Sequence, residues 1–360
     1  MNAVVDAPFK NPAPQRDALL QAFTRVLDAG GAAPRRELHL FETAFARHCE
    51  AAHAVGVANG PDALLLALRA LGVGAGDEVI VPSHSPIAPW LAVQHTGATP
   101  VPVEPDPATG NIDAARVAPA ITRRTKLLLV VHHDGQPADM HALCIVAREH
   151  GLKVLEDASQ AHGARWREQR IGAHGDAVAW SFAPGSNLAA LGEAGAVTTR
   201  DAALAEKIRQ LRSGEWHSPL GEIEAALLST QLPLLDAGNT QRALLAKRYL
   251  LGLRHETLAL PVVAEGAMPV WHRFVVRHPQ RDRLAALLHE AGVKVQLPPA
   301  PPHRQPGFAD LGLRAGALPV AEMLQAQSLA LPIEPTQTLA QIDEVIAVLR
   351  HALAELRQRL

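Results

Sequence analysis

Between residues 53 and 200 the sequence alternates short runs of β-branched and other apolar residues with segments that have helical apolar spacing. The expected strands cover residues 53–58, 78–82, 99–103, 126–132, 153–156, 176–182 and 195–199. Helix-patterned segments such as 62–71 and 138–150 separate them. Regular alternation of this kind is typical of a largely parallel sheet covered by helices, so the chain is predicted to have an α/β fold.

The pattern changes after residue 201, where long helices are expected at 202–212, 223–235 and 241–254. A strand-like run at 270–277, a helix at 281–291, and amphipathic helices at 319–330 and 339–356 follow. A chain of 360 residues is long enough for two domains. We predict a large α/β domain with N-terminal helices over residues 1–236 and a small C-terminal α/β domain over residues 237–360.

Charge and composition exclude several classes of partner. The 34 basic and 36 acidic residues give a net charge of -2, and no block of like charge argues for nucleic acid or a membrane surface. The 18 histidines are scattered without metal-ligand spacing, so no metal is expected. No apolar run approaches the roughly 18–20 residues of a membrane span, and residues 1–11 lack a signal-peptide pattern. These features favour a cytoplasmic protein.

Polar residues lie at the ends of three of the expected strands, those at 53–58, 153–156 and 176–182, at the edge where parallel sheets bind ligands. The turn Asn59-Gly60-Pro61-Asp62 begins a helix whose free N–H groups suit a phosphate, although it also fits an ordinary capped helix start. Asp157, Gln160 and His162 follow the strand at 153–156. An aspartate there can hold a cationic ring nitrogen, and a surface turn is the alternative interpretation.

The order and spacing of these motifs resemble one family over most of the chain. The segments are VANGPDALLLALRALGVGAGDEVIVPSHSPIAPWLAVQHTGATPVPVEPD, GQPADM, GLKVLEDASQAHGA, GEAGAVTT, VWHRFVV and LPVAEMLQAQSLALPIEP. They are similar to the DegT/StrS family of nucleotide-sugar aminotransferases. The resemblance implies the type I fold of pyridoxal-phosphate enzymes, with a mostly parallel sheet of seven-stranded type. It also implies a homodimer with sites at the subunit interface, a pyridoxal or pyridoxamine phosphate cofactor (PLP or PMP), and a nucleotide-sugar ligand. Such proteins serve the synthesis of surface polysaccharides or sugar-bearing antibiotics.

The resemblance assigns roles to particular residues. Asp157 matches the aspartate that faces the pyridine nitrogen, Gln160 the glutamine near the ring oxygen, and His162 the histidine of the same motif. Ser181 matches a serine that binds the cofactor phosphate, and Gly60 the glycine of the phosphate-binding turn. The pyridoxal ring would carry the chemistry, while the protein orients it and supplies its charge partner.

The sequence departs from the family pattern at the catalytic position. The family lysine that forms the Schiff base and transfers protons is replaced by Ser186. A serine hydroxyl cannot form an imine, and without an adjacent base it is a poor proton carrier. Pro61 also replaces a threonine of the phosphate turn, Pro86 replaces an aromatic that stacks on the ring, the loop at 213–221 is short, and the His-Tyr-Pro element is changed at 297–300.

Three functions therefore compete. The favoured one is a non-catalytic binding or regulatory protein, or a partner subunit of a catalytic relative. The second is a lysine-free, PMP-dependent sugar-modifying enzyme of dehydratase type, in which a histidine such as His84 or His162 acts as base. The third is an ordinary glutamate-dependent sugar aminotransferase. A single engineered lysine substitution would also produce Ser186, but the dispersed changes favour natural divergence.

Overall fold

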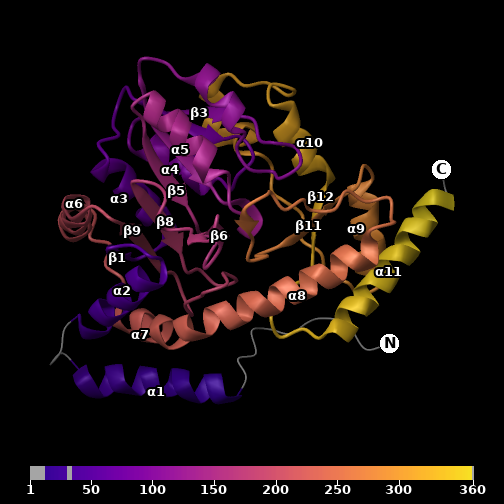
Figure 1. Cartoon of the computed structure of the whole chain (residues 1–360), viewed down its shortest axis with the longest axis horizontal. Helices are drawn as coiled ribbons and strands as arrows, with labels where there is room; N and C mark the ends of the chain where they lie inside the picture. The colour runs from indigo at the N-terminus through magenta and orange to yellow at the C-terminus, as the bar shows by residue number, and fades with distance from the viewer. Residues whose placement is uncertain (1–12, 31–34, 359–360) are drawn as a thin grey trace.

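The computed structural model describes residues 13–30 and 35–358. Its helices are α1 (Ala13–Ala29), α2 (Arg36–His48), α3 (Gly60–Ala70), α4 (Ala88–His95), α5 (Met140–Glu149), α6 (Ala202–Ser213), α7 (Glu222–Gln231), α8 (Leu235–Leu253), α9 (Arg281–Glu290), α10 (Pro319–Gln327) and α11 (Leu339–Gln358). Figure 1 shows a sheet-centred body beside which the long helix α8 runs toward α11.

The central sheet has seven strands in the order β1-β9-β8-β5-β4-β2-β3. They are β1 (His53–Val57), β2 (Glu78–Pro82), β3 (Thr99–Val103), β4 (Thr125–Val131), β5 (Lys153–Asp157), β8 (Ala177–Ser181) and β9 (Gly195–Thr199). Neighbouring strands from β3 to β8 run parallel, whereas β9 is antiparallel to both β1 and β8. The predicted α/β class and mostly parallel sheet are confirmed.

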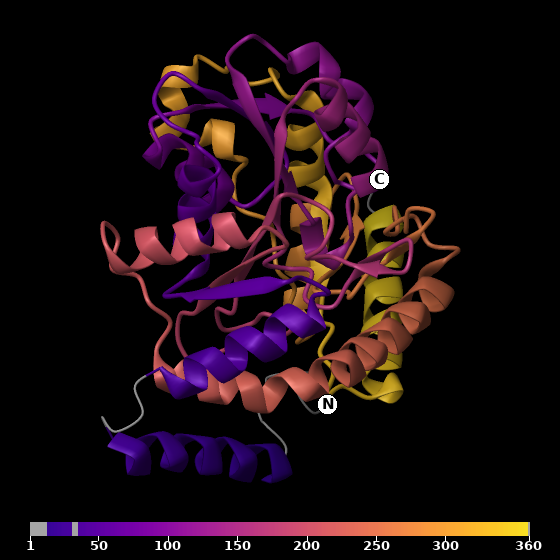
Figure 2. The ribbon, with the colours of Figure 1, turned by 60° about the vertical axis from the view of Figure 1, so that its left-hand side comes forward.

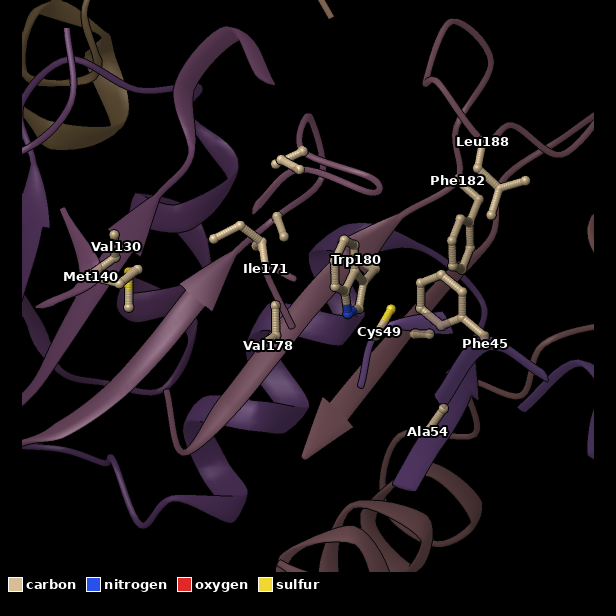
Figure 3. Close-up of a cluster of buried hydrophobic side chains, with 14 of the residues drawn as sticks. Phe45, Cys49, Ala54, Val130, Met140, Ile171, Val178, Trp180, Phe182 and Leu188 are labelled. Carbon is tan, nitrogen blue, oxygen red and sulfur yellow. The ribbon is translucent and has the colours of Figure 1, made fainter. Parts of the chain in front are cut away.

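Helices cover both faces of this sheet because its strands are apolar on both sides. Along β4, Leu127 and Leu129 enter the hydrophobic cluster under α3, α4 and α6, whereas Leu128 and Val130 enter the cluster under α2, α5 and α7. The alternation follows from the two-residue period of a strand. In the second cluster Phe45, Trp180 and Phe182 lie close together (Figure 3), with ring centroids 5.2 Å apart for Phe45 and Trp180.

The C-terminal part has a hydrophobic cluster of its own. It is formed by residues 245–356, from α8, α9, α11 and the antiparallel pair β11 (Phe274–Arg277) and β12 (Ser328–Leu331). Figure 2 shows α1 at the outer edge of the molecule, and α1 contacts α7. The predicted boundary between residues 236 and 237 falls at the start of α8 and stays a prediction.

The structure departs most from the expected elements at three places. The segment 319–330 was expected to be one helix, but the helix ends at Gln327 and residues 328–331 form β12, because pairing with β11 overrides the local preference. Helix α8 begins at Leu235 and is longer than the predicted 241–254. The short strands β6 (Arg165–Trp166), β7 (Gln169–Arg170) and β10 (Ala267–Met268) form a small sheet that the apolar pattern did not indicate.

Within the described ranges, no helix combines the length and the apolar character that crossing a membrane requires. The same residues contain no cluster of three or more His, Cys, Asp or Glu side chains suited to a metal ion.

Candidate active site

A cavity of about 380 Å³ lies at the carboxyl ends of the parallel strands. Val131, Asp157 and Ser181, which end β4, β5 and β8, contribute to its wall. The remaining wall residues come from the start of α3, the loops after β2, β5 and β8, and the C-terminal part of the chain; they include Gly60, Pro61, Gln160, Ser186, His272, Arg273 and Glu334. Six of the seven site residues predicted above, Ser186 among them, thus line one cavity, and His162 does not.

The start of α3 forms one end of the cavity. A Cβ atom on Gly60 would lie 2.5 Å from the Cβ of Ser181, so only glycine lets the helix start approach that serine. The Asn59 side chain accepts a hydrogen bond from the Asp62 N–H (2.8 Å), and its carbonyl accepts one from Ala63. Pro61 has no N–H. The turn therefore offers the Gly60 N–H to an anion, and the neighbouring Ser181 adds its hydroxyl as a second donor.

Asp157 is the buried acid of the cavity. Its side chain accepts a hydrogen bond from the Ser159 N–H (3.0 Å), and the residue is only 4% exposed. Burial raises the pKa of this carboxyl group because the charged form loses water. No described cation forms an ion pair with it, so a cationic ring N–H would supply the missing partner.

Gln160 and His162 have different environments. Gln160 lines the cavity, and its Oε1 accepts a hydrogen bond from the Asp134 N–H (2.7 Å), which holds the left-handed turn at Asp134. His162 is fully buried, with its ring 5.4 Å from the rings of Trp180 and Phe182. Burial lowers the pKa of His162 to about 3. The ring packs against the core and His162 does not line the cavity, so its predicted role in cofactor binding stays a prediction.

Ser186 lines the cavity in the loop after β8. Its hydroxyl donates to the Ser181 carbonyl at 3.3 Å, and its N–H donates to the Ala183 carbonyl. None of the described carboxylates or imidazoles forms a hydrogen bond with this hydroxyl, so Ser186 lacks the base that activates a nucleophilic serine. None of the described lysines lines the cavity either.

Two residues of the cavity come from a segment that carries part of the family resemblance but to which the sequence analysis assigns no site residue. His272 and Arg273 belong to the motif VWHRFVV and reach the cavity from the C-terminal part of the chain. Arg273 lies 3.7 Å from Asp134 and is partly exposed. Their position depends on how the two parts of the chain dock, and no local pattern encodes that. The histidine in a motif that resembled the family was the available signal.

A second cavity of about 220 Å³ adjoins the first and shares Pro86, Gln160, Arg273 and Gln296 with it. Its wall also includes His84 and the proline-rich segment at 297–301. The His84 ring lies 4.4 Å from the His133 ring, and burial lowers the pKa of His84 to about 3. His84 therefore borders the neighbouring cavity and does not line the one that contains Ser186.

A seven-stranded sheet of this order, an acid at the end of a central strand and a second unit that contributes to the cavity define the fold of the PLP-dependent aminotransferases. The sequence model of the DegT/DnrJ/EryC1/StrS aminotransferase family matches residues 15–350. The chain belongs to that family.

The chain is similar to curated and solved members along nearly its whole length. It is 48% identical over 341 residues to dTDP-3-amino-3,4,6-trideoxy-alpha-D-glucose transaminase of Streptomyces venezuelae, covering 90% of each chain. The crystal structure of S. venezuelae DesV in complex with a ketimine intermediate matches with a TM-score of 0.90 at 47% identity, covering 94% of this chain and 95% of that one. Bacillus subtilis NtdA with bound PMP matches with a TM-score of 0.87 at 28% identity, covering 97% and 85%.

Proposed function

We propose that this protein binds PLP or PMP non-covalently, together with a nucleotide sugar, and does not carry out lysine-dependent transamination. The observation that carries the proposal is the combination of a buried, unpaired Asp157 with Ser186 in a cavity that no described lysine lines. The family membership and the PMP-bound relative support the cofactor class. We further propose that the protein is a homodimer, as the resemblance implies, and cytoplasmic, as the sequence features favour.

The residues present fit such a cofactor at its ring end. The Asp157 carboxylate would hold the protonated pyridine nitrogen, and that pairing would lower the raised pKa of Asp157. The Gly60 N–H and the Ser181 hydroxyl would hold the phosphate. When bound, the pyridine ring supplies a sink for the electron pair of a broken C–H bond. The chain positions the ring and shields Asp157 from water.

The substrate would enter from the second cavity. Arg273 lies where the two cavities meet and is the cationic side chain shared by both walls. We propose that its guanidinium contacts an anionic group of the amino donor or of the nucleotide sugar. Arg273 also lies near Asp134, so the incoming anion would compete with that carboxylate for it.

A non-catalytic role is the second candidate, and the phosphate end of the cavity favours it. Pro61 removes one N–H of the first turn of α3, and Asn59 occupies the next two. A cofactor held there makes few hydrogen bonds and has no covalent anchor. If affinity is lost, the remaining role is a ligand-binding or partner subunit of a catalytic relative.

A titration of the full chain with PLP and with PMP, followed by calorimetry and visible absorption, tests the proposal. The wild type is expected to bind PMP saturably and to show no visible imine band with PLP. Ser186→Lys is expected to gain an imine band that borohydride reduction makes permanent, whereas Ser186→Ala, the matched control, gains none. Absence of binding for both cofactors would contradict cofactor binding, and an imine band in the wild type would contradict the lysine-free site.

A further inference from the structure

His272 is the imidazole in the wall of the cavity that also contains Ser186 and Asp157. Lysine-free chemistry at this site needs another group that can accept a proton. The hydrogen bonds around His272 define which of its two ring nitrogens can do so.

A directional chain of hydrogen bonds starts at a backbone carbonyl and ends at His272. The carbonyl of His162 can only accept, so Asn239 Nδ2 donates to it at 2.8 Å. The Asn239 Oδ1 then accepts from Asn187 Nδ2 at 2.8 Å, and Asn187 Nδ2 also donates to the Val270 carbonyl at 3.0 Å. Both contacts orient the Asn187 amide with its nitrogen toward these two acceptors.

The remaining Asn187 oxygen determines the tautomer of His272. This Oδ1 lies 3.3 Å from His272 Nδ1 and cannot donate, so Nδ1 carries the hydrogen. A neutral imidazole with hydrogen on Nδ1 has a free lone pair on Nε2. Burial, followed by the charges of Arg273 and Arg242 and the imidazoles of His162 and His133, lowers the pKa of His272 well below its usual value. The ring is therefore neutral at pH 7.

The backbone holds this imidazole in a fixed place. Trp271, directly before His272, has a φ of 50°, a left-handed conformation that is costly for a bulky residue. Gly135 has a φ of 86°, and a Cβ there would lie 2.7 Å from the backbone nitrogen of His272. The Gly135 carbonyl accepts from the Val270 N–H at 2.9 Å. Strained backbone held by close contacts is a feature of functional sites.

We propose that Nε2 of His272 replaces the missing lysine as the proton acceptor of this site. This inference rests on the proposed function, because the proton must come from a carbon atom of a ligand bound in the cavity. One C–H bond breaks, its electron pair passes into the bound pyridine ring, and one N–H bond forms on the imidazole. The imidazolium then returns a proton to the same or a neighbouring carbon, so no oxidant or reductant is needed. Asn187 is a positioning residue that keeps the lone pair on Nε2.

Exchange of the α-proton of L-glutamate for deuterium, in D₂O with PLP and the full chain, tests the acceptor. The wild type is expected to exchange faster than PLP and glutamate alone, and His272→Gln to slow exchange by roughly 10²–10⁴-fold, or to the protein-free rate where that is reached first. His278→Gln is the matched control, since His278 lies outside both cavities. Exchange by His272→Gln at the wild-type rate would overturn the inference, and so would a wild-type rate no faster than that of PLP and glutamate alone.

Two further measurements separate this inference from the proposed function. ¹⁵N NMR of the free protein at pH 7 is expected to show hydrogen on Nδ1 of His272, and Asn187→Leu is expected to disturb that tautomer while circular dichroism stays unchanged. Hydrogen on Nε2 of the wild type would overturn the inference without any cofactor present. PMP binding without proton exchange would overturn the inference and leave the proposed function intact, whereas loss of PMP binding would overturn both.

Discussion

Replacing Asp157 with asparagine is expected to have opposite effects on the free protein and on cofactor binding. Asp157 is 4% exposed and has no cationic partner, and burial raises its pKa. Asparagine has nearly the same shape and keeps an oxygen that can accept from the Ser159 N–H. The substitution therefore removes the buried charge and leaves the local hydrogen bond in place.

The direction of the stability change follows from proton linkage. The pKa of Asp157 is higher in the folded than in the unfolded chain, so the unfolded chain loses its proton first as pH rises. The carboxyl group therefore destabilises the fold increasingly between its unfolded pKa and its folded pKa. Each unit of the pKa difference corresponds to about 1.4 kcal/mol at neutral pH. Asp157→Asn is expected to raise the free energy of unfolding at pH 7, and the gain is expected to disappear below pH 4.

Cofactor binding is expected to change in the other direction. A hydrogen bond to a charged group contributes about 1.5–3 kcal/mol, so losing the charged contact to the pyridine nitrogen is expected to weaken PMP binding by roughly 10–150-fold. Urea denaturation of the cofactor-free protein measures the first effect, and calorimetric titration with PMP measures the second. A less stable free variant, or PMP affinity equal to that of the wild type, would refute the assignment of Asp157 as an unpaired ring contact.

Two further substitutions test the surroundings of the cavity. Glu156→Ala removes the fully buried acceptor of His132 Nε2–H (2.9 Å) and of the Gly175 N–H (2.6 Å), and is expected to lower the free energy of unfolding by about 3–5 kcal/mol in urea titrations. Burial raises the pKa of Glu156, but its hydrogen bonds and the nearby imidazoles of His132 and His174 outweigh burial and hold the pKa below its usual range. The wild-type advantage should therefore fade as pH drops below about 4.5. Gly60→Ala forces a contact with Ser181 and is expected to lower the free energy of unfolding by about 1–3 kcal/mol, measured by thermal unfolding. The same substitution is expected to weaken binding of inorganic phosphate. A loss under 1 kcal/mol for either variant would contradict the packing described.

The parts of the fold that could be predicted are those with a strong local signal. The run of residues 126–132 is uniformly apolar because β4 is buried on both faces, so its identity as a central strand follows from the sequence. Asp157 could be placed at the ligand edge for the same reason, since a polar group directly after a buried strand lies at the carboxyl end of the sheet.

What could not be predicted depends on contacts between distant segments. Residues 328–331 have no strand signature and become β12 only because β11 offers backbone partners. The direction in which His162 points is equally nonlocal: its motif places it near the cavity, but packing against Trp180 and Phe182 turns the ring into the core.

His272 is the most instructive case. Its tautomer is set by Asn187 and Asn239, which lie 85 and about 30 residues away along the chain, and neither amide could be linked to it before the fold was known. The prediction that a lysine is missing rests on one position, whereas the group that we propose in its place is defined by three segments that meet only in the folded chain. A sequence comparison restricted to Ser186 would therefore classify the site as inactive, although a neutral imidazole lines the same cavity.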